Sequence, residues 1–261
     1  MIAEINGKIS RTGSNLSDRL EDQLTGNFFG SLRYLPFEHG IKTILQNSVY
    51  PKSTLDCLPS HLYEWHNRIL FWESFERTEP DVIIELDDVV ILIEVKLHSG
   101  LSSDDNPDEI LLQSDEQKLE SRNQLARESR LLIKQYPQCK KKFLILLAPE
   151  DSAAEIYRNI KNREKNGERI IEDGVDFGYI TWQKTLIELS NLSIDNAFQK
   201  LVVQDLTSLL RQKGFERFDG FNYDIPNIDK EAYWQFNYTA VPNFVFGNCE
   251  FVTEDMYYEF K

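Results

Sequence analysis

Pro80-Asp-Val-Ile-Ile-Glu-Leu-Asp-Asp-Val-Val-Ile-Leu-Ile-Glu-Val-Lys96 is the stretch of this chain that decides its fold. Val and Ile lie on both sides of the pair Asp87-Asp88, which predicts two β-strands joined by a tight turn. A turn centred on these two residues places Asp81 directly opposite Glu94 on the neighbouring strand. Directly opposed side chains share one face of the sheet, with Cβ atoms about 4.5–5.5 Å apart.

Lys96 is expected on the same face as Glu94, because side chains along a strand alternate with a period of two. The opposed carboxylates of Asp81 and Glu94 repel each other unless a cation lies between them. Asp81, Glu94 and Lys96 therefore form a candidate site for a hard divalent metal ion and an attacking water. The alternative is a charged edge cluster, in which the same residues form salt bridges that discourage aggregation.

The composition is that of a globular protein with an acidic balance. Hydrophobic residues make up 41% of the chain and charged residues 28%, and the formal net charge is −14. This charge argues against a protein that coats nucleic acid non-specifically, but it is compatible with an enzyme that has a local basic groove. No apolar run is long enough to span a bilayer, and the scattered cysteines form no metal-ligand pair or disulfide framework. We therefore expect a cytoplasmic protein without a membrane partner.

Hydrophobic periodicity and breaker residues predict helices and strands along residues 1–213. The predicted helices cover 16–34 (with a break near Gly26 or Gly30), 37–47, 115–136, 151–163, 183–191 and 195–213, and the predicted strands cover 67–76 (where a helix also fits), the two halves of 80–96, 142–148 and 177–182. Strands that are first adjacent and then alternate with helices indicate an α/β domain with a mixed sheet covered on both faces. Residues 214–261 are rich in Phe, Tyr and Trp, and we expect this aromatic extension to pack on the core.

The chain resembles the PD-(D/E)XK nuclease superfamily, which has the restriction-endonuclease-like fold. The resemblance is carried by Pro80-Asp81 and Glu94-Val95-Lys96 and by their position on consecutive strands. It implies an αβββαβ core that cleaves phosphodiester bonds with a divalent metal, Mg²⁺ or Mn²⁺. It further implies that Asp81, Glu94 and the carbonyl of Val95 bind the metal and that Lys96 orients the attacking water.

The same resemblance assigns further residues on two helices. Glu21 on the first helix corresponds to an additional metal-binding glutamate, with Asp18 and Asp22 as rivals for that role. On the helix after the lysine strand, Gln124 would face the active site and Arg127 would reach a phosphate.

The resemblance, which covers residues 16–190, also implies a partner, namely nucleic acid, with DNA favoured over RNA. A homodimer or an accessory subunit is compatible with it. Two alternatives come from the negative charge and from the lack of an obvious basic groove. One is a catalytically weak or inactive binding or assembly module on the same fold, and the other is an acidic interaction protein.

Overall fold

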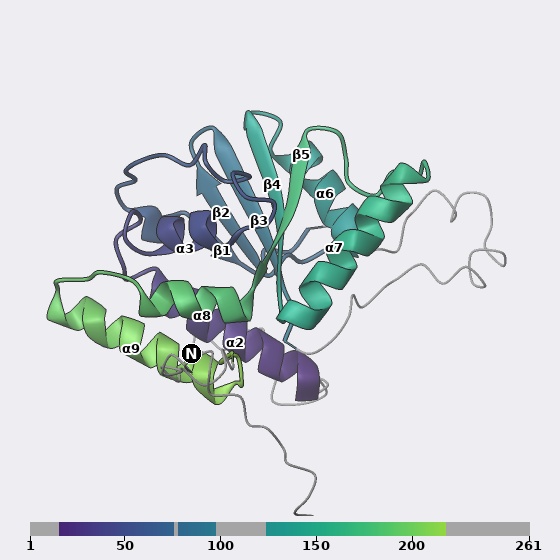
Figure 1. Cartoon of the computed structure of the whole chain (residues 1–261). Coiled ribbons are helices and arrows are strands. Elements are labelled where there is room, and N and C mark those ends of the chain that lie inside the picture. The colour runs from purple at the N-terminus through teal and green to yellow at the C-terminus, as the bar shows by residue number, and fades with distance from the viewer. Residues whose placement is uncertain (1–15, 76–77, 98–123, 218–261) are drawn as a thin grey trace, which may run out of the picture. The chain divides into compact units, whose positions relative to one another are not determined.

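The computed structural model describes residues 16–75, 78–97 and 124–217 (Figure 1). The helices are α2 (Leu16–Leu32), α3 (Ile41–Ser48), the 3-10 helix η1 (Trp65–Asn67), α6 (Gln124–Gln135), α7 (Glu150–Lys165), α8 (Trp182–Ser190) and α9 (Ala197–Gln212). The strands are β1 (Ile69–Phe71), β2 (Val82–Leu86), β3 (Val89–Val95), β4 (Lys141–Ala148) and β5 (Val175–Thr181). None of these helices is long and apolar enough to cross a membrane. The aromatic extension lies outside the described residues from position 218 onward.

The strands form one five-stranded sheet in the order β1-β2-β3-β4-β5. β2 runs antiparallel to both of its neighbours, β1 and β3, whereas β3, β4 and β5 run parallel to one another. Val82 lies opposite Ile93 and Leu86 lies opposite Val89, so the hairpin turn is centred where the sequence predicts it. The predicted α/β architecture with a mixed sheet is therefore confirmed.

Helices cover both faces of the sheet, which explains why β3 and β4 are almost continuously apolar. All residues of β3 are buried, and in β4 only Lys141 is exposed. One face packs against α2, α3, α8 and α9, and the other packs against α6 and α7 (Figure 1). Alternate residues of β3 enter the two cores: Ile91 and Ile93 enter the first, and Val90 and Leu92 enter the second.

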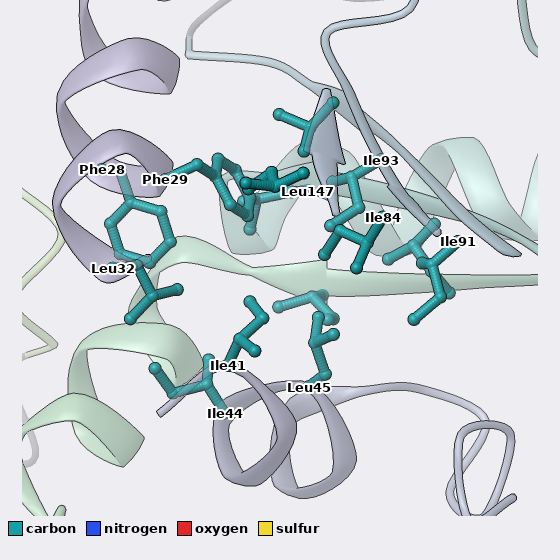
Figure 2. Packing of buried hydrophobic residues seen from close by; sticks show 14 of the residues in the cluster. Phe28, Phe29, Leu32, Ile41, Ile44, Leu45, Ile84, Ile91, Ile93 and Leu147 are labelled. Carbon is teal, nitrogen blue, oxygen red and sulfur yellow. The ribbon is translucent and has the colours of Figure 1, made fainter. Parts of the chain in front are cut away.

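The core on the α2 side explains why α2 is one continuous helix. Figure 2 shows side chains of α2 and α3 packed toward the sheet, with labels on Phe28, Phe29, Leu32, Ile41, Ile44, Leu45, Ile84, Ile91, Ile93 and Leu147. The predicted break near Gly26 or Gly30 is wrong, because α2 runs unbroken from Leu16 to Leu32. Glycine in a helix costs about 1 kcal/mol relative to alanine, whereas each large apolar side chain buried here stabilises the fold by about 1.5–3 kcal/mol.

Three other predicted elements differ in extent from those observed. The strand expected at 67–76 is limited to β1, and the positive φ of 48° at Trp72 ends it. The short helix expected at 37–47 begins only at Ile41. The helix expected at 115–136 corresponds to α6 from residue 124 onward, and residues 115–123 lie outside the described part of the chain.

Candidate active site

Glu94 lies near the end of β3, and Lys96 directly follows that strand. Side-chain alternation along β3 places both on the same face as Val90 and Leu92, the face that α6 covers. Glu94 is completely buried and Lys96 is 5% exposed. The expectation that these two residues share a face is therefore confirmed, and both are far more buried than a charged sheet edge would be.

Asp81 immediately precedes β2 and stands beside these residues at the open end of the hairpin. One of its carboxylate oxygens, Oδ2, accepts a hydrogen bond of 2.9 Å from the backbone N–H of Val95. This bond ties the start of β2 to the end of β3 and leaves the second oxygen of Asp81 for another ligand. Asp81 is 8% exposed, so its carboxylate has little contact with solvent.

Lys96 is held between two carboxylates that come from opposite sides of the sheet. Its Nζ lies 2.6 Å from Oε1 of Glu94 and donates a hydrogen bond of 3.1 Å to Oε1 of Glu21. Glu21 belongs to α2, and its second oxygen accepts the backbone N–H of Leu97 at 2.7 Å. The carbonyl of Lys96 accepts a hydrogen bond of 2.9 Å from the indole N–H of Trp182. The lysine is thus fixed through both its side chain and its backbone.

Glu21 is the residue of α2 that the structure brings to Lys96. Both of its carboxylate oxygens are engaged by protein donors, so its observed role is to hold Lys96 and Leu97 in place. Its assignment as a metal ligand stays a prediction. Of its two rivals, the side chain of Asp18 lies outside the described residues.

Glu128 on α6 is a member of this site that the sequence analysis missed. It is completely buried, and the carboxylates of Glu128 and Glu94 lie close enough to raise the pKa of Glu94. Leu125 and Leu132 lie about one turn before and after it and are also completely buried. A glutamate among the apolar positions of an amphipathic helix was the signal that could have revealed it.

Burial and mutual repulsion shift the titration of all these groups. Burial raises the pKa of Glu94 well above its usual range, and the neighbouring Glu128 adds to the effect. Burial likewise raises the pKa of Asp81, with Glu94 as the next cause, and it raises the pKa of Glu128 to about 7. Burial alone would lower the pKa of Lys96, but Glu94, Glu21 and Asp81 raise it above its ordinary value. The lysine is therefore charged, and the excess carboxylates need protons or a cation.

The donors at the open end of the hairpin fit a hard divalent cation. Apart from the ion pair with Lys96, no donor among the described residues reaches the carboxylate of Glu94. Mg²⁺ takes oxygen ligands and needs only one or two carboxylates, because waters and substrate phosphates complete its shell. Within the described ranges, no three Asp, Glu, His or Cys side chains form a group that could hold a metal ion. Carbonyl, solvent or phosphate oxygens would therefore contribute to the shell of a bound ion.

The remaining predicted site residues lie on α6 and at the end of β3. Gln124, the first residue of α6, lies close enough to Glu128 to lower that residue's pKa, although no well-directed hydrogen bond reaches the Glu128 oxygens. The site therefore does extend toward Gln124. Arg127 is partly buried on the same helix, and its contact with a phosphate stays a prediction. The metal-binding role of the Val95 carbonyl also stays a prediction.

Comparison with known proteins adds no assignment to this geometry. No family model matches the chain, and no curated protein and no solved structure matches it either. The function of the site must therefore be inferred from its own residues.

Proposed function

We propose that this protein is a metal-dependent nuclease with a restriction-endonuclease-like core, and that it hydrolyses phosphodiester bonds in DNA. The observation that carries the proposal is the burial of Lys96 between the carboxylates of Glu94 and Glu21, beside Asp81. Desolvating charges in this way costs several kcal/mol per ion, a cost that is typical of functional sites and unnecessary in an edge salt bridge. The element order α2, α3, η1, β1, β2, β3, α6, β4 supports the proposed core, because it contains the αβββαβ succession that the resemblance implies, with α3 and η1 inserted before the first strand.

The residues of the site divide the chemistry between binding and positioning. A bound divalent ion would polarise the scissile phosphate and lower the pKa of a water. Asp81 and Glu94 would supply the carboxylate oxygens that hold such an ion. Lys96, charged and fixed by Glu21, orients the attacking water and stabilises the negative charge that develops on the phosphate.

A cleavage assay with two lysine variants tests the proposal. Plasmid and single-stranded DNA are incubated with the wild type, Lys96→Ala and Lys140→Ala in Mg²⁺, Mn²⁺ or EDTA. Lys140 is a matched control, because its Nζ also lies 2.6 Å from a hairpin carboxylate, that of Asp88, but on the surface. We expect metal-dependent cleavage by the wild type and by Lys140→Ala, with a loss of at least about 100-fold in Lys96→Ala.

Two results would contradict the assignment in different ways. Full activity in Lys96→Ala would remove the lysine from the mechanism. No cleavage by the wild type under any condition would favour a non-catalytic protein over a nuclease.

A binding or assembly module on the same fold is the second candidate. The net charge of −14 favours it, because affinity for phosphates depends on clustered Lys and Arg. Calorimetric titration with Mg²⁺ or Mn²⁺ in the presence of DNA separates the two functions, since only the nuclease needs the ion. An acidic interaction protein would keep its partner after joint replacement of Asp81, Glu94 and Lys96.

The partners belong to the same proposal. DNA is the favoured substrate, RNA is the competing one, and parallel assays with both nucleic acids decide between them. A homodimer or an accessory subunit would compensate for the acidic charge of the chain by adding basic surface. Sedimentation of the purified protein with and without DNA measures whether the protein acts as a monomer.

A further inference from the structure

Two carboxylates face each other inside the protein between β3 and α6. Glu94 and Glu128 are both completely buried. The two carboxylates lie within hydrogen-bonding reach of each other, and Gln124 lies close to Glu128. Among the described residues, no other well-formed hydrogen bond reaches Glu128, and Glu94 also has its ion pair with Lys96. Two buried carboxylates that share a single ammonium are strongly unfavourable, so the pair requires an explanation.

Lys96 is the positively charged side chain that acts on both carboxylates of the pair. The two contacts of the Lys96 ammonium go to Glu94 and Glu21. Ser129, next to Glu128 on α6, uses its hydroxyl oxygen to accept the backbone N–H of Glu172 at 2.6 Å. A proton shared by the two carboxylates, or a cation bound by both, would therefore have to offset their repulsion.

We propose that Glu128 is a further ligand of the divalent ion that Asp81 and Glu94 would hold. This inference rests on the proposed function and extends it, because it adds a ligand from a helix to the acids on the strands. Carboxylate oxygens, completed by waters and phosphate oxygens, are the ligands that Mg²⁺ or Mn²⁺ takes, so Glu128 suits the ion as well as Asp81 and Glu94 do. The ion would replace the repulsion between Glu94 and Glu128 by attraction to both.

Metal binding by three glutamine variants tests this assignment without relying on cleavage. Mn²⁺ alone is titrated into the wild type, Glu94→Gln, Glu128→Gln and Glu188→Gln, with calorimetry and the Mn²⁺-induced rise in Tm as readouts. Glu188 is a matched control, because it is a 9% exposed glutamate whose oxygens are paired with Asn47 and Lys184. We expect Glu128→Gln and Glu94→Gln to weaken Mn²⁺ binding at least about tenfold, and Glu188→Gln to bind like the wild type.

Each other result identifies what has failed. If Glu94→Gln loses Mn²⁺ but Glu128→Gln keeps it, Glu128 is only a proton-sharing neighbour, and the inference is overturned while the proposed function stands. If the wild type binds no Mn²⁺ even with DNA, both are overturned. Circular dichroism in EDTA checks folding. If Glu128→Gln is unfolded, Glu128→Asp takes its place, since its carboxylate is one methylene shorter, and wild-type affinity in that variant would count against the ligand role.

Discussion

The two ends of the β2–β3 hairpin carry the same kinds of residue in opposite surroundings. At the turn end, Asp87 lies 2.9 Å from Arg68 and Asp88 lies 2.6 Å from Lys140. The side chains of these two aspartates are 77% and 61% exposed. Such surface pairs add little to the stability of the fold, because water and salt screen them and because ordering two long side chains costs entropy.

At the open end the same chemistry is enclosed. Asp81, Glu94 and Lys96 are at most 8% exposed, and Glu128 from α6 is completely buried beside them. Charges on the surface hardly lower the stability of the folded protein. Buried carboxylates with raised pKa values lower it substantially. The two ends carry the same residue types, so burial is what distinguishes a candidate functional site from surface ion pairs. Only the open end needs a functional explanation.

The largest effect is expected when the lysine at the open end is removed and compared with removal of the lysine at the turn. In metal-free buffer at about pH 8, Lys96→Ala should lower the free energy of unfolding by about 3–5 kcal/mol, because it leaves buried carboxylates without their cation. Lys140→Ala should leave stability unchanged within error. Urea denaturation followed by circular dichroism measures both. Equal stability of the two variants would mean that the buried carboxylates do not depend on Lys96.

The next effect is a pH dependence that comes from the open end. Burial raises the pKa of Glu128 from its ordinary value of 4.5 to about 7, so the folded protein holds a proton that the unfolded chain releases. The stabilising contribution of protonated Glu128 is complete below about pH 4.5 and is lost as the pH rises through about 7. Thermal unfolding in EDTA should therefore show Tm falling over this range.

Two comparisons assign that slope to the buried pair. Glu128→Gln should make the fall of Tm with pH shallower, because the group that titrates is gone. Saturating Mn²⁺ should also reduce the fall in the wild type, since the ion replaces the proton. An identical slope in Glu128→Gln would show that other groups cause it.

The hairpin could be predicted from the sequence because its information is local. The Asp87-Asp88 pair interrupts two β-branched runs, and the period of two then fixes which residues face Glu94. Alternation and the position of the turn are therefore sufficient to bring Asp81, Glu94 and Lys96 together. The same reasoning failed for Gly26 and Gly30, since contacts with distant elements outweigh their low helix propensity.

The remaining parts of the site depend on contacts between distant elements. Glu21 reaches Lys96 from α2 on the opposite face, and no local pattern shows that its second oxygen accepts the N–H of Leu97. Glu128 differs from an ordinary surface glutamate of a helix only because α6 covers Glu94. Sequence spacing identified the residues on the hairpin, whereas packing determined which helical residues complete the site.

A smaller effect is expected at Trp182, which holds the backbone of Lys96 from the α2 side of the sheet. Trp182→Phe removes the indole N–H that donates to the Lys96 carbonyl at 2.9 Å and should cost about 1–3 kcal/mol of stability. Trp65→Phe is the control, because it removes a similar buried bond of 2.7 Å, to the carbonyl of Leu35, away from the site. Both variants should be destabilised in urea, but only Trp182→Phe should also slow DNA cleavage. Equal cleavage would show that Lys96 does not need this support.

The smallest effect is expected from removing a carboxylate at the turn. Asp88→Asn keeps the shape of the turn residue and removes its ion pair with Lys140, whose side chain is exposed to solvent. The pairing of β2 with β3 should survive, because the β-branched residues on both sides of the turn fix the register. Unfolding in urea and Mn²⁺ affinity should both match those of the wild type. A large loss of either property would show that charge at the turn is coupled to the open end. The contrast between the two ends would then fail, because burial alone would no longer distinguish functional from structural charges.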